Sequence, residues 1–83
     1  MDRDEINATE DLAREAAAEL RFAMGKHGSM AGPHEGYAVI LEELDELWDE
    51  VKRQVADRKS MRKEALQVAA MALRFVRDVC DKR

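Results

Sequence analysis

The sequence predicts an all-α protein, and three observations lead to that prediction. Ala, Leu, Glu, Arg and Met, which favour helices, are abundant among the 83 residues, whereas aromatic residues make up 5%. The chain has one Pro and four Gly, and three of the glycines lie between Gly25 and Gly32. Outside this segment, apolar residues recur with the 3.6-residue period of a helix. We therefore expect three helices in a single domain spanning residues 1–83.

The first predicted helix covers about residues 4–24, where Leu12, Ala16 and Leu20 follow the helical period. Segment 25–32 is predicted to be a loop, because repeated glycine disfavours regular structure. Pro33 suits the first turn of a second helix, since a first-turn residue needs no N–H donor.

The second predicted helix is amphipathic and runs to about residue 56. Its expected core face consists of Tyr37, Ile40, Leu44, Leu47, Trp48, Val51 and Val55. A short loop at 57–59 should follow, with Ser60 as the N-cap of a third helix that ends near residue 81.

Apolar residues spread over roughly 200° of the third predicted helix, so it needs cover from two directions. One face consists of Ala65, Val68, Ala72, Phe75, Val76 and Val79, and an adjoining row of Leu66, Leu73 and Cys80. A chain this short buries only about 60% of its unfolded surface. We therefore expect a homo-oligomer; cover by the first helix alone is the alternative.

Composition and charge exclude several classes of function. The net charge of −4 provides no basic excess for a phosphate backbone, so duplex nucleic acid is not expected as a partner. No apolar run approaches the roughly 18 residues of a membrane span, and the acidic residues 1–5 do not resemble a signal peptide. The single cysteine, Cys80, excludes an internal disulfide. A soluble cytoplasmic protein is the expectation.

A set of carboxylates indicates a divalent-metal site. Glu43, Glu46 and Glu50 form one stripe along the second helix, with Glu35 and Glu42 further round. If the second and third helices pack antiparallel, Glu64 and the side-chain oxygen of Gln67 meet this stripe. Such hard oxygen ligands suit Mg²⁺ or Mn²⁺, which can present phosphate oxygens for reaction. A merely solvated acidic face is the alternative.

The motif Glu42-Glu43-x-x-Glu46, followed by Glu64-x-x-Gln67, resembles the MazG family of all-α nucleoside triphosphate pyrophosphohydrolases. Lys26-His27-Gly28 and segment 34–51 look like the compact single-module members common in phages, and the resemblance covers about residues 20–80. It implies a helical bundle assembled as a homo-dimer or tetramer. It also implies magnesium-dependent hydrolysis of a (d)NTP to a (d)NMP and pyrophosphate.

The resemblance also implies roles for individual residues. Glu43, Glu46 and Glu64 would bind the metal, and Gln67 stands where the family has Asp. The uncharged amide would weaken metal binding unless another carboxylate helps, and Glu50, Glu42 and Asp78 are available. Glu42 or Glu46 could serve as the general base, and a metal-bound hydroxide is the alternative. Substrate contacts are expected from Lys26, His27 and Arg74. The alternative is a non-catalytic oligomerisation module that keeps the family fold, which Gln67 favours.

Overall fold

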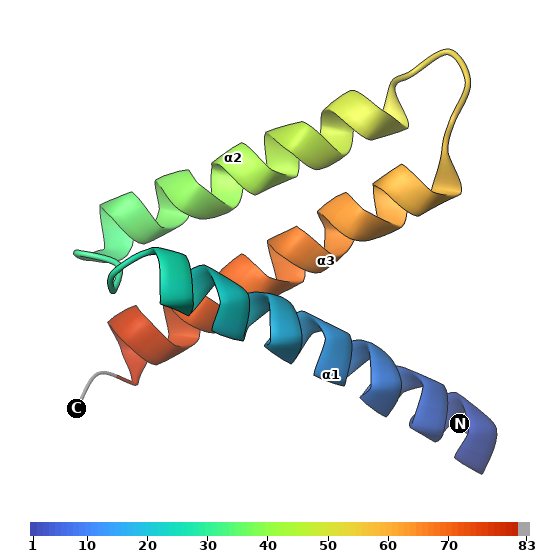
Figure 1. The fold of residues 1–83 in the computed structure, drawn as a ribbon, viewed down its shortest axis with the longest axis horizontal. Helices are drawn as coiled ribbons and strands as arrows, with labels where there is room; N and C mark the ends of the chain where they lie inside the picture. The colour runs from blue at the N-terminus through green and yellow to red at the C-terminus, as the bar shows by residue number, and fades with distance from the viewer. Residues whose placement is uncertain (82–83) are drawn as a thin grey trace.

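The all-α prediction is confirmed in a computed structural model that describes residues 1–81 (Figure 1). The elements are α1 (Arg3–Lys26), α2 (Pro33–Val51), α3 (Arg58–Phe75) and the π-helix η1 (Val76–Cys80), which continues α3. This part of the chain contains no strand. The last two residues of the predicted domain, 82 and 83, lie outside the described residues. Among residues 1–81, no helix combines the length and apolarity needed to cross a bilayer.

Helices α2 and α3 lie side by side as an antiparallel hairpin, and α1 crosses α3 (Figure 1). The first 15 residues are exposed, and the buried residue of α1, Ala16, lies in its C-terminal half. Gly36 allows a close approach within the hairpin, because a Cβ atom there would lie 2.6 Å from Cδ2 of Phe75. The hairpin carries the residues predicted to bind metal.

Buried polar groups hold the loop between α1 and α2 against α3. The guanidinium of Arg74 donates a hydrogen bond to the carbonyl oxygen of Gly28. Asp78 accepts a hydrogen bond of 3.1 Å from the backbone N–H of Met30 and lies 3.5 Å from Arg74. Because both charged side chains are more than nine-tenths buried, their mutual pairing offsets the cost of removing them from water.

The boundary between α2 and α3 differs from the prediction. Helix α2 ends at Val51 rather than near residue 56. Ser60 is not the N-cap of α3: Asp57 is, accepting hydrogen bonds from the N–H of Lys59 (3.0 Å) and from the hydroxyl of Ser60 (2.7 Å). An N-cap residue has an extended backbone, which Asp57 adopts, so the chain must leave the helical conformation before it.

The predicted core face of α2 is largely exposed. Tyr37, Leu44, Trp48 and Val51 are 45–58% exposed, and Val55, in the connection after α2, is 82% exposed. Only Ile40 and Leu47 of this face are half-buried. The amphipathic pattern places these residues on one face of α2, but the prediction that this face forms the core is wrong for most of them within residues 1–81. Within residues 1–81, the buried apolar residues are Ala16, Met30, Ala70 and Met71.

Replacing Gly36 with alanine is expected to destabilise the chain by about 1–3 kcal/mol, because the new methyl group overlaps the ring of Phe75. Gly25→Ala is the matched control, since Gly25 is also helical and a methyl group there would meet no atom within 4 Å. Urea unfolding of both variants measures the effect. Equal stabilities for the two variants would contradict the close contact between Gly36 and Phe75.

Candidate functional site

Three glutamates of the hairpin converge on one volume. Glu43 and Glu46 lie one turn apart on α2, and Glu64 reaches them from α3. One carboxylate oxygen from each lies within 4.8 Å of the other two. We call Glu43, Glu46 and Glu64 the glutamate cluster. The antiparallel packing of the hairpin thus brings together three of the predicted metal ligands.

Two glutamates of this cluster, Glu43 and Glu64, have raised pKa values, because they are partly buried and lie close to the charge of Glu46. Partial burial, followed by the charge of Glu46, raises the pKa of Glu43 to about 7. Partial burial and Glu46 also raise the pKa of Glu64, although Lys63 partly offsets this increase. At neutral pH the glutamate cluster therefore retains a proton or needs a cation, because three close carboxylates cannot all ionise without an electrostatic cost.

A cleft of about 450 Å³ adjoins the glutamate cluster between the C-terminal half of α1, the following loop and the hairpin. Glu43 belongs to both the cluster and the cleft wall. The other predicted site residues on this wall are Lys26, His27, Glu42, Gln67 and Arg74. A larger cavity of about 950 Å³, beside Ser29 and Asp81, contains no member of the cluster. The smaller cleft is therefore the candidate binding site.

Gln67 lies on the cleft wall, one turn of α3 after Glu64. Its amide donates a hydrogen bond of 2.6 Å to a carboxylate oxygen of Glu19 on α1. Sequence reasoning did not single out Glu19. The sequence signal that could have indicated Glu19 is its spacing of four residues from Glu15, which places both side chains on one face of α1. Glu15 also contacts α3, through an ion pair with Arg62.

The other carboxylates considered as ligands have different surroundings. Glu50 lies 3.2 Å from the guanidinium of Arg53, near the end of α2, and its charge contributes to the raised pKa of Glu64. Glu42 is exposed at the edge of the cleft. Asp78 is engaged with Arg74 and the loop, at the other end of the hairpin.

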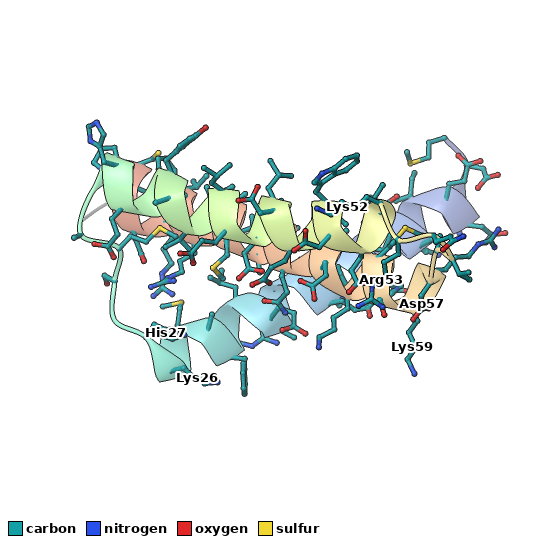
Figure 2. The ribbon with its side chains drawn as sticks, turned by 90° about the horizontal axis from the view of Figure 1, so that it is seen from above. Lys26, His27, Lys52, Arg53, Asp57 and Lys59 are labelled. Atoms are coloured by element: carbon teal, nitrogen blue, oxygen red, sulfur yellow. The ribbon has the colours of Figure 1, made fainter. Side chains whose placement is uncertain are left out.

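Cationic side chains occupy the end of the cleft at the α1–α2 loop. Lys26 and His27 lie there, far from Lys52 and Arg53 at the α2–α3 turn (Figure 2). The ammonium nitrogen of Lys26 lies 5.2 Å from the ring centroid of Phe22, an aromatic residue on the cleft wall that sequence reasoning missed. Arg74 is buried, and part of its hydrogen-bonding capacity is used by Gly28.

Carboxylates next to a cleft with basic residues suit a ligand that combines a divalent cation with anionic groups. Comparisons of the chain with protein-family models, with curated proteins and with solved structures found no match. The resemblance to the MazG family therefore remains a prediction from the motif.

The raised pKa of Glu43 predicts that the metal-free chain loses stability as the pH rises from about 4.5 to about 7. Between the unfolded value of 4.5 and the folded value of about 7, the native carboxyl binds a proton that the unfolded one has released. The free energy of unfolding therefore falls as the pH rises. The lowered pKa values of Glu15 and Asp57 affect the free energy of unfolding only at more acidic pH, below this window.

Thermal unfolding in a metal chelator across this pH range measures the effect. Glu43→Gln should flatten the decline, and Glu35→Gln, at an exposed position of the same helix, should leave it unchanged. Added Mg²⁺ should also flatten it. A midpoint that is constant or rises with pH in the chelated wild type would be inconsistent with the raised pKa.

Proposed function

We propose that this chain is a divalent-metal-dependent nucleoside triphosphate pyrophosphohydrolase that converts a (d)NTP into a (d)NMP and pyrophosphate, acting as a homo-dimer or tetramer. The observation that carries the proposal is the glutamate cluster, whose three carboxylates come within 4.8 Å of one another beside a cleft. The order and spacing of the glutamates, which resemble those of the MazG family, support this choice of reaction over other phosphate chemistry.

The residues of the cluster fit Mg²⁺ or Mn²⁺. Both ions prefer hard oxygen ligands and bind through a few carboxylates while keeping water molecules. The raised pKa of Glu43 supports this assignment, because a bound dication removes the repulsion that raises it. Glu43, Glu46 and Glu64 would hold the ion, and Gln67 and Glu50 are the further candidate ligands. When bound, the ion neutralises phosphate charge and polarises phosphorus.

The side chains around the cleft would position the substrate and move a proton. Lys26 and Arg74 would pair with phosphate oxygens, and His27 would contact the phosphates or the base. Glu42 or Glu46, the exposed carboxylates next to Glu43, would accept a proton from the attacking water. Water attacks the α-phosphorus, the bond to the bridging oxygen breaks, and pyrophosphate leaves with that oxygen.

A non-catalytic oligomerisation module that keeps this fold is the second candidate. The hydrogen bond between Gln67 and Glu19 favours it, because the amide at the fourth ligand position is used to attach α1 to α3. The two candidates differ in turnover, which only the enzyme would show.

Mg²⁺ or Mn²⁺ is expected to support pyrophosphate release from at least one of the standard NTPs and dNTPs. Glu46→Gln should lower the rate on the order of 100-fold or more, because it removes a metal ligand and a possible base. Asp45→Asn is the matched control, since it removes one negative charge from the neighbouring position outside the cluster. No turnover of any nucleotide with either ion would support the non-catalytic module instead.

Gln67→Asp is expected to tighten Mn²⁺ binding in calorimetry, because it adds a carboxylate at the position where the family has Asp. The new carboxylate would face Glu19, so a bound cation is needed to offset their repulsion. Gln67→Asn, which keeps the amide, controls for the shorter side chain. Unchanged affinity in Gln67→Asp would place the ion away from Gln67.

A further inference from the structure

Glu19 and Gln67 connect α1 to the wall of the candidate cleft. The side-chain amide of Gln67 donates a partly buried hydrogen bond of 2.6 Å to a carboxylate oxygen of Glu19. Both residues line the cleft of about 450 Å³. Glu15, one turn earlier on α1, also contacts α3, through an exposed ion pair with Arg62. Of these two contacts between the helices, only that of Glu19 borders the cleft.

Gln67 lies next to the glutamate cluster. It follows Glu64 by three residues on α3, which places both side chains on the same side of that helix. On α2, Glu46 approaches Glu64, and Glu43 lies three residues before Glu46. Because the two helices are antiparallel (Figure 1), Glu43 and Gln67 lie at about the same level of the hairpin. Both also line the cleft, so Gln67 borders the volume in which the proposed ion binds.

The hydrogen bond to Glu19 determines which end of the Gln67 amide faces α1. An ionised carboxylate only accepts hydrogen bonds, whereas an amide has a donor nitrogen and an acceptor oxygen. The nitrogen of Gln67 must therefore face Glu19, and it does. The amide oxygen is left as the atom that can face a cation. Because Mg²⁺ and Mn²⁺ accept carbonyl oxygens as well as carboxylates as ligands, this orientation suits metal binding.

We propose that Glu19 is a positioning residue of the metal site, which holds the Gln67 amide so that its oxygen binds the ion together with the glutamate cluster. A group that is hydrogen-bonded to a metal ligand fixes the orientation of that ligand. The charge of Glu19 also polarises the amide, which makes the amide oxygen a better ligand. The proposal rests on the divalent-metal site proposed above, and it makes α1 a part of that site.

A purely structural role, in which Glu19 only attaches α1 to α3, is the competing interpretation. Glu15 provides the comparison, because it lies on the same face of α1 and has its own polar contact with α3. If attachment were the only role, losing either carboxylate would affect the chain in the same way. Positioning instead predicts that only the loss of Glu19 changes metal binding.

Calorimetric titration with Mn²⁺ compares Glu19→Leu with Glu15→Leu. Both substitutions remove one carboxylate from α1 and introduce a good helix former. We expect Glu19→Leu to weaken Mn²⁺ binding about tenfold or more. Glu15→Leu should change it by less than about twofold, because the exposed Glu15 is outside the cleft. Equal changes in the two variants would mean that Glu19 only attaches α1, and would overturn the proposal.

A double-mutant cycle with Gln67→Leu separates positioning from a direct effect of the Glu19 charge on the ion. If Glu19 acts through Gln67, adding Glu19→Leu to Gln67→Leu should not weaken Mn²⁺ binding any further. A further loss as large as the one that Glu19→Leu causes alone would show that its charge acts on the ion without Gln67. That result would also overturn the proposal.

Nuclear magnetic resonance of the wild-type chain provides a test that does not require a variant to fold. The chain has two glutamines, and Gln54 lies outside the cleft, in the connection after α2. Saturating Mg²⁺ should shift the side-chain amide signals of Gln67 and leave those of Gln54 in place. Unchanged Gln67 signals would overturn the proposal.

The failure of this inference can be distinguished from the failure of the proposed function. A wild-type chain that binds neither Mg²⁺ nor Mn²⁺ would refute both. Mn²⁺ binding that is unaffected by Glu19→Leu would refute only the positioning role of Glu19, and turnover that depends on Glu46 would still support the enzyme.

Discussion

The antiparallel contact between α2 and α3 determines the rest of the structure. Gly36 allows the helices to approach until its backbone meets the ring of Phe75. In the same antiparallel packing, Glu43 and Glu46 face Glu64. Because Glu43 is partly buried and lies close to Glu46 and Glu64, the same packing raises the pKa of Glu43 toward neutrality. A contact that stabilises the hairpin thus creates an electrostatic repulsion that a cation would relieve.

Helix α1 forms the opposite wall of the cleft beside the glutamate cluster. It is attached to α3 by the ion pair of Glu15 with Arg62 and by the hydrogen bond of Glu19 with Gln67. Arg74 and Asp78 attach the loop that follows α1 to α3 and η1 by hydrogen bonds to its backbone. The cleft therefore has carboxylates on its hairpin side and basic groups near the loop, and this arrangement is the basis of the proposal that it binds a metal-bound polyphosphate.

Local sequence signals predicted much of this arrangement. The helical periods and the glycine-rich segment indicated the three helices, and Pro33 begins α2 as expected. The spacing of Glu43, Glu46 and Glu64 predicted their convergence, because these positions border the faces by which the two helices meet. The start of α3 could not be predicted from local sequence, because both Asp57 and Ser60 are good N-cap residues. Only the observed hydrogen bonds show that Asp57 is the N-cap.

Features that depend on how helices are placed in space were not predictable. The apolar pattern of α2 showed that one face avoids water, but not that α3 would leave Leu44 and Trp48 exposed. Glu19 and Phe22 were missed for the same reason, since their presence at the cleft follows from the crossing of α1 over α3.

The central claim, that the glutamate cluster holds a divalent cation, is tested most directly by anomalous X-ray scattering from a crystal grown with Mn²⁺. We expect an anomalous peak within coordination distance of carboxylate oxygens from Glu43, Glu46 and Glu64. A peak elsewhere with none at these three residues, in crystals that contain the ion, would contradict the claim.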